Sequence, residues 1–126
     1  MPAEVPLRYK HPRARHLVRE GDFKATYASG GRARCELFSV VVRPNGGAHT
    51  RLGLSVGKVA YRDATDRNRA RRVLREAFRL SRHELPDGYD VILIGRAGAG
   101  RLALAPVLSE LAGLVRKAAR RAAERA

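Results

Sequence analysis

One stretch of the chain concentrates arginine on a helical pattern. Seven arginines and a single acidic residue, Glu76, lie between Arg67 and Arg82. At the roughly 100° per residue of an α-helix, the apolar residues of this stretch gather on one side: Ala70, Val73, Leu74, Ala77 and Phe78. The opposite side, an arc of about 100°, holds Asn68, Arg71, Arg72, Arg75 and Arg79. Guanidinium groups stay charged and pair with phosphate oxygens, so the pattern predicts a helix that binds a phosphate-rich partner.

The overall charge favours the same kind of partner. The 126 residues include 26 Lys and Arg against 12 Asp and Glu, for a formal net charge of +14. An ordinary solvated helix face is the alternative interpretation of the arginines, but such a face usually mixes both signs of charge. With 44% apolar residues, the chain can also bury a core, unlike a disordered basic tail. Nucleic acid is the first candidate partner, ahead of an anionic membrane surface, because no run of about 18 apolar residues exists.

The sequence offers little for catalysis by protein side chains. Its four histidines lack the spacing of metal ligands, and Cys35 is the single cysteine, which is most simply a small buried residue. The loop at Gly95–Gly100 lacks the lysine and hydroxyl residue of a phosphate loop. Asp63 and Asp66 form either a divalent-ion pair or, as we favour, a cap for the arginine helix. We therefore expect no catalytic residue, metal or cofactor held by the protein itself.

The N-terminal region divides into an arm and the start of a domain. Residues 1–15, with three prolines among basic residues, are predicted to form a flexible basic arm, and residues 16–126 one domain. The apolar core of a signal peptide is missing from residues 1–24, so we expect a cytoplasmic location. A short helix is predicted over residues 16–28, with its end at Gly30-Gly31.

Three strands can be predicted from the sequence. Residues 35–43 are rich in β-branched and aromatic side chains, a turn signal follows at 44–47, and residues 52–56 form a second strand. The segment 35–56 is therefore expected to form a β-hairpin. Residues 89–95 are expected to form a buried strand, because their apolar run lacks polar alternation.

Two further helices complete the predicted order α-β-β-α-β-α. The arginine helix has Thr65 or Asp66 as its expected N-cap. The last helix is expected to begin near Pro106, a favourable residue for a first turn, and its C-terminal half is basic, which suits the helix dipole. This order indicates one sheet with helices packed against it.

Several of these segments together resemble a known family. The string Arg51-Leu-Gly-Leu-Ser-Val-Gly-Lys58, an eight-residue spacer, and then Arg67-Asn-Arg-Ala-Arg-Arg-Val-Leu-Arg-Glu-Ala-Phe-Arg79 resemble the bacterial ribonuclease P protein component. The pair Phe23-x-x-x-Tyr27 and the segment Gly88–Arg96 extend the resemblance over most of the chain. Two departures stand out: Val59 replaces a second lysine that many members carry, and the following connection lacks the common glycine.

The resemblance implies an α+β fold. The expected architecture is a single-domain α/β sandwich, with one mostly antiparallel four-stranded sheet packed with three helices in the order α-β-β-β-α-β-α. It includes a left-handed βαβ crossover, contrary to the usual right-handed rule. The fourth strand then lies either inside residues 35–56 or near Arg32-Ala33.

The resemblance also implies a function. The protein would join a large catalytic RNA to make the endonuclease that removes 5′ leaders from precursor tRNAs. Hydrolysis would belong to Mg²⁺ bound by the RNA, while the protein would supply binding and positioning. No membrane and no obligate protein partner is implied.

Two sets of residues receive roles through this resemblance. Contact with the catalytic RNA is implied for Lys58, Arg67, Asn68, Arg69, Arg71, Arg72 and Arg75. The helical projection supports Asn68, Arg71, Arg72 and Arg75 most directly, whereas Arg67 and Arg69 lie at the margins and either contact RNA or brace the helix. Phe23 and Tyr27 share one helix face and either pack in the core or, as the resemblance favours, line a cleft for the single-stranded leader. Phe38 is a weaker candidate because its facing is not fixed, and Phe78 is expected in the core.

Two other classes of protein remain open on composition. One is a non-enzymatic RNA-binding module, such as a ribosomal protein or an assembly factor. The other is a basic DNA-compacting protein, which would bind duplexes with little regard for RNA shape. The pattern from Lys58 to Arg79 favours the ribonuclease P interpretation over both.

Overall fold

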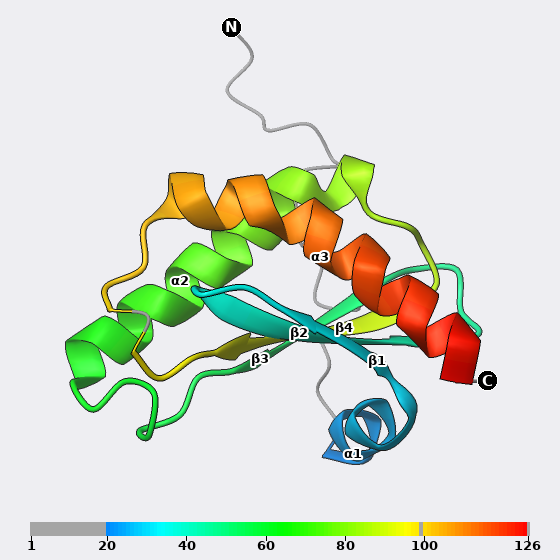
Figure 1. Ribbon diagram of the computed structural model, residues 1–126, viewed down its shortest axis with the longest axis horizontal. Coiled ribbons are helices and arrows are strands. Elements are labelled where there is room, and N and C mark those ends of the chain that lie inside the picture. Colours follow the sequence, from blue (N-terminus) through cyan, green and yellow to red (C-terminus); the bar gives the residue numbers. More distant parts are fainter. Residues whose placement is uncertain (1–19, 99, 126) are drawn as a thin grey trace, which may run out of the picture.

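The computed structural model describes residues 20–98 and 100–125. Within these residues, a sheet of four strands carries α2 (Ala64–Ser81) and α3 (Leu104–Arg125) on one face, and α1 (Glu20–Ser29) on the other (Figure 1). A short 3-10 helix, η3 (Arg82–Glu84), follows α2. The predicted arm at residues 1–15 lies outside the described residues.

The strands are β1 (Gly31–Arg34), β2 (Phe38–Pro44), β3 (Arg51–Ser55) and β4 (Tyr89–Gly95), in the spatial order β1-β2-β4-β3. The pairs β1–β2 and β2–β4 are antiparallel, and β3 pairs with β4 in parallel. In the described part of the chain, the order of elements and the mostly antiparallel sheet confirm the expected α+β fold. The left-handed sense of the β3–α2–β4 crossover stays a prediction.

The predicted hairpin over residues 35–56 is wrong. Strand β4 lies between β2 and β3, so the two segments on either side of the turn do not pair with each other. The reason is the apolar run from Val91 to Leu93, which is buried and needs neighbours on both edges and cover on both faces. A run of this kind takes a central position in a sheet, and β3 is left at the edge.

The fourth strand, for which two positions were predicted, is β1 near Arg32-Ala33. Its burial alternates along the strand, with Ala33 buried and Arg32 and Arg34 exposed. The strand predicted over residues 35–43 begins later, at Phe38, because the chain first turns: the Cys35 amide donates to the Phe38 carbonyl at 3.0 Å. Cys35 itself is half-buried against the core.

The helix boundaries differ from the predictions by a few residues. The N-cap of α2 is Asp63, not Thr65 or Asp66, since the Asp63 carboxylate accepts from the Thr65 amide at 2.7 Å. Asp66 instead lies in the first turn, where a negative charge favours the helix dipole. The last helix, α3, begins two residues before Pro106, which still lies in the first turn, where a missing N–H breaks no helical hydrogen bond.

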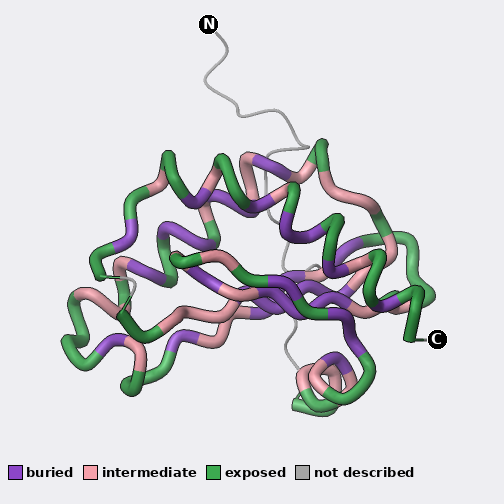
Figure 2. The backbone as a smooth tube through the Cα atoms, in the orientation of Figure 1, coloured by how far each residue is buried: buried purple, intermediate pink, exposed green. Residues whose placement is uncertain are grey.

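The larger core lies between the sheet and the helices α2 and α3 (Figure 2). Its fully buried members include Phe38, Val40, Val42, Leu74, Phe78, Val91, Leu93, Leu111 and Val115. Both Phe38 and Phe78 have no exposed surface, which confirms the expectation for Phe78 and removes Phe38 from the surface candidates. A smaller cluster on the opposite face consists of Val41 and Ile92, with α1 packed against it.

One buried carboxylate on that second face ties the strands together. Asp90 of β4 has no exposed surface and lies directly opposite Arg43 of β2 and Arg51 of β3 in the strand register. It accepts two hydrogen bonds from Arg51, both at 2.8 Å, one from Asn45 at 3.0 Å and a longer one from Arg43 at 3.4 Å. Burial acts to raise the pKa of Asp90, but the hydrogen bonds from Arg51 and Asn45 outweigh it, so the pKa lies below its ordinary value of 3.8.

We expect Asp90→Asn to lower the free energy of unfolding by about 3 kcal/mol at neutral pH, because it removes the buried carboxylate charge that pairs with the half-buried guanidinium groups of Arg43 and Arg51. The pKa of Asp90 is lower in the folded state, so its contribution is present above the unfolded value and is lost as the pH falls. The difference between wild type and variant should therefore shrink from about pH 5 to about pH 2. Urea unfolding across this range measures it.

Asp87→Asn is the matched control, because Asp87 is an exposed carboxylate three residues away. It should leave the unfolding curve nearly unchanged at every pH. A difference for Asp90→Asn that stays constant down to pH 2 would contradict the charge-based account.

Candidate nucleic-acid interface

Helix α2 presents the predicted polar face to solvent. Asn68, Arg71, Arg72 and Arg75 are all exposed, whereas the side chains of Ala70, Val73, Leu74, Ala77 and Phe78 are buried. Glu76, the one acid among them, is already ion-paired with Arg79. Arg79 is half-buried, so it is less exposed than the helical projection predicts. The exposed α2 face, defined by Asn68, Arg71, Arg72 and Arg75, is therefore strongly positive.

The two marginal arginines of the motif hold neighbouring loops in place. Arg67 donates to the carbonyl of Tyr61 at 3.1 Å, and thus fixes the connection that leads into α2. The Nε of Arg69 donates to the carbonyl of Leu102 at 2.9 Å, just before α3. Both side chains are half-buried. The geometry thus supports a bracing role for Arg67 and Arg69, the second of the two roles open to them.

Lys58 lies in the connection between β3 and α2. Strand β3 ends at Ser55, and Lys58 sits in a turn at residues 58–60. Arg71 donates to the Val56 carbonyl at 3.2 Å, which holds this connection against α2. Lys58 is exposed, and Val59 next to it has 90% of its surface exposed. The position at which many family members carry a second lysine is therefore a surface position here.

The aromatic pair lies on the other side of the sheet. Phe23 and Tyr27 project from α1 and are half-buried against Val41, Ile92 and Ile94. Because α1 and α2 lie on opposite faces of the sheet (Figure 1), the aromatic pair and the exposed α2 face belong to separate surfaces. One protein can therefore contact two different nucleic-acid segments.

A hollow of about 390 Å³ lies over β1 and the neighbouring parts of β2 and β4. Its lining includes Arg32, Arg34, Ser39 and Ile94, and the Arg32 guanidinium lies over the Tyr27 ring, 5.6 Å from its centre. Sequence reasoning missed these two arginines. Their signal was present, because Arg32-Ala33-Arg34 alternates charged and apolar residues, as a strand with one buried face does.

Residues 20–98 and 100–125 contain no cluster of three or more His, Cys, Asp or Glu side chains that could hold a metal ion. Asp63, one of the two candidate carboxylates, is committed to the α2 cap. Among the described helices none is long and apolar enough to cross a membrane.

Comparison with known proteins agrees with this arrangement. A profile of the Ribonuclease P family matches residues 11–119. The ribonuclease P protein component of Desulfovibrio desulfuricans is 39% identical over 117 residues, which cover 90% of this chain and 89% of that protein. The structure of the Thermotoga maritima RNase P protein is similar with a TM-score of 0.72 and 30% identity, over 81% of this chain and 96% of that one. A Staphylococcus aureus RNase P protein gives a TM-score of 0.71 at 27% identity, over 82% and 94% of the two chains.

The chain belongs to the ribonuclease P protein component family. It is thus a subunit of an endoribonuclease holoenzyme that works with an RNA subunit in the 5′ processing of tRNA. This assignment explains why the protein carries a strongly positive surface on α2. It also sets aside the ribosomal-protein and DNA-compacting alternatives.

The division between bracing and exposed arginines predicts different effects on stability. Arg69→Ala should lower the free energy of unfolding by about 1–2 kcal/mol, because the Leu102 carbonyl loses a charged donor. Arg72→Ala, on the exposed α2 face, should change it by no more than about 0.5 kcal/mol. Urea unfolding of the two variants makes the comparison, and equal effects would contradict the bracing role.

Proposed function

We propose that this chain binds the catalytic RNA subunit through the exposed α2 face and Lys58, and that it holds the 5′ leader of precursor tRNA along α1. The observation that carries the proposal is the exposure of Asn68, Arg71, Arg72 and Arg75 on one face of a helix whose other face is buried. Arg67 and Arg69 belong to the same RNA-binding motif and act at its margins, mainly by fixing the loops around α2. The holoenzyme works in the cytoplasm.

Forked guanidinium groups suit this task. Each can pair with phosphate oxygens through two parallel hydrogen bonds, and their spacing along α2 follows the helical repeat rather than a base sequence. Such contacts fix position and supply affinity but do not read sequence directly. The α2 face therefore recognises the shape of a folded RNA backbone.

The leader contacts rest on a different kind of interaction. Phe23 and Tyr27 offer aromatic surface on which unpaired bases can stack without strict sequence choice. The neighbouring Arg32 and Arg34 can meet the phosphates of the same strand. Both rings are half-buried, so part of each remains accessible for stacking.

The hydrolytic step is assigned to the RNA subunit and its Mg²⁺. The carboxylates near the α2 face do not form a suitable site, because Asp63 accepts from the Thr65 amide and serves as the helix cap. The role of this chain is thus to bind, orient and shield charge, with no metal or cofactor of its own.

Reconstitution with a bacterial ribonuclease P RNA at low Mg²⁺ tests the proposal. The protein should stimulate cleavage of precursor tRNA, and Arg71→Ala/Arg72→Ala/Arg75→Ala should weaken binding of the RNA subunit. The log–log salt dependence of that binding should flatten by roughly two units, at about 0.7–0.9 per lost phosphate contact.

The control removes the same number of charges elsewhere. Arg101, Lys117 and Arg120 are exposed and lie outside α2, so their triple alanine variant should keep most of the slope. Failure to stimulate cleavage would refute the function, whereas equal slopes for both triple variants would refute the assignment to the α2 face.

The leader site makes a separate prediction. Phe23→Leu/Tyr27→Leu keeps apolar contact with the sheet but removes both aromatic faces, so it should weaken binding of leader-bearing tRNA by about 1–3 kcal/mol per lost stacking contact. Affinity for mature tRNA should stay the same. An equal loss of affinity for both ligands, or a variant that does not fold, would show that Phe23 and Tyr27 serve in packing and not in leader binding.

A further inference from the structure

Helix α1 has little apolar contact to hold it on the sheet. Among its ten described residues, Thr26 alone is fully buried, and Phe23 and Tyr27 supply the main apolar contact. Figure 2 shows much of this helix as half-buried or exposed. A helix of this length is marginal by itself and depends on tertiary contacts, so polar contacts at its ends add to what holds it in place.

The C-terminal end of α1 is held by arginines from outside the helix. Arg125, the last described residue of α3, donates to the Gly30 carbonyl at 2.7 Å and to the Ala28 carbonyl at 3.2 Å. Arg32 of β1 donates to the Tyr27 carbonyl at 3.0 Å. The last carbonyls of a helix lack partners within it and carry the negative end of its dipole, so these guanidinium groups cap α1 from α3 and β1.

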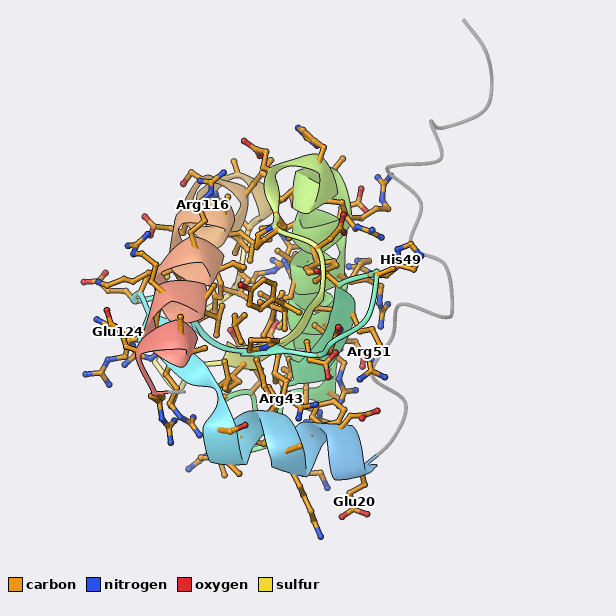
Figure 3. The ribbon with its side chains drawn as sticks, turned by 90° about the vertical axis from the view of Figure 1, so that its right-hand side faces the viewer. Glu20, Arg43, His49, Arg51, Arg116 and Glu124 are labelled. Carbon is orange, nitrogen blue, oxygen red and sulfur yellow. The ribbon has the colours of Figure 1, made fainter. Side chains whose placement is uncertain are left out.

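The N-terminal end of α1 is linked through Arg51 to Asp90, the buried carboxylate of β4. Arg51 forks onto Asp90 and also reaches Asp22, in the first turn of α1, at 3.2 Å. Figure 3 shows Arg51 and Arg43 between the sheet and the first turns of α1, which starts at Glu20. The strands are thereby linked to the start of the helix, as α3 is linked to its end.

The basic end of α3 therefore has a structural use. Arg116 donates to the Glu84 carbonyl at 3.1 Å, Arg121 to the Arg32 carbonyl at 2.7 Å, and Arg125 to the Ala28 and Gly30 carbonyls at the C-terminal end of α1. These contacts direct three guanidinium groups at backbone oxygens of neighbouring segments. Arg120, one turn from Arg116, is exposed and provides a comparison on the same helix.

We propose that Arg125 and the Arg51–Asp22 pair are positioning residues for the leader site, which fix α1 at both ends and so aim Phe23 and Tyr27 at the leader. This inference rests on the proposed leader contact of those two aromatic residues. Arg125 touches neither tRNA nor the RNA subunit in this role. Its effect on substrate passes entirely through the placement of α1.

The test uses the reconstituted holoenzyme and two ligands, leader-bearing precursor tRNA and mature tRNA. Arg125→Ala should weaken binding of the precursor about fivefold, a loss of the size expected when one charged hydrogen-bonding group is removed, and leave binding of mature tRNA unchanged. Arg125→Lys, which keeps the charge but not the fork, should recover part of the loss. Arg120→Ala removes the same charge from α3 and should leave both affinities unchanged.

A double-mutant cycle separates positioning from general destabilisation. If Arg125 acts through the aromatic pair, Arg125→Ala should have little further effect on precursor binding when Phe23→Leu/Tyr27→Leu is already present. Asp22→Asn provides a second variant at the other end of α1, one that leaves the Arg51–Asp90 pair in place. It should show the same loss confined to the precursor and the same dependence on the aromatic pair.

Three results would overturn the inference. They are an additive cycle, an equal loss for Arg120→Ala, and unchanged precursor binding in Arg125→Ala while Phe23→Leu/Tyr27→Leu lowers it. The third result leaves the proposed leader site standing. If the aromatic variant itself has no effect on precursor binding, the leader site and the positioning role both fail, while assembly with the RNA subunit is unaffected.

Discussion

The carboxylate of Asp90 is the interaction on which the arrangement of this sheet depends. It is buried, it lies directly opposite Arg43 and Arg51 in the strand register, and Arg51 extends the contact to Asp22 in α1. A slip of one residue in either pairing would place charged side chains on the face that packs against α2 and α3. Separating a buried charge from its partner costs several kcal/mol, so registers that part Asp90 from Arg43 and Arg51 are disfavoured, and the contact with Asp22 favours the observed position of α1.

The central position of β4 has a consequence for RNA binding. Strand β4 lies between β2 and β3 and runs parallel to β3. The chain must therefore cross over one face of the sheet between the end of β3 and the start of β4, and α2 forms that crossover. One side of α2 then packs in the core and the other side faces outward along its length. The positive face is therefore carried by a rigid element, which keeps the guanidinium groups at fixed spacing for a folded RNA.

Local patterns in the sequence predicted the three α-helices and three of the four strands of the described residues, and the polar face of α2, because each depends on the periodicity of a single segment. The fourth strand and the leader role of the aromatic pair came from the family resemblance instead. The pairing of the strands was predicted wrongly for residues 35–56, because pairing depends on which segment has the most apolar surface to cover. Residues Val91–Leu93 of β4 are fully buried and take the central position, which leaves the shorter β3 at the edge. The N-cap was misplaced by two or three residues because Asp63, Thr65 and Asp66 all suit a helix start. The contacts of Arg125 and Arg51 join residues far apart in the chain, and no local pattern signals them.

The arginines of this protein fall into groups that composition cannot distinguish. Those on the exposed α2 face are open to solvent, although Arg71 also donates to the Val56 carbonyl. In contrast, the half-buried or α3 arginines that donate to backbone carbonyls of neighbouring segments are Arg67, Arg69, Arg116, Arg121 and Arg125. A guanidinium group bonded to a carbonyl keeps its charge, so bracing arginines still contribute to the field that attracts RNA. Arginine thus allows the fold to be braced without reducing the positive potential, which an uncharged donor could not do. A net charge of +14 is then partly a consequence of how the protein is held together, and the RNA contacts need only the fraction of it that faces outward.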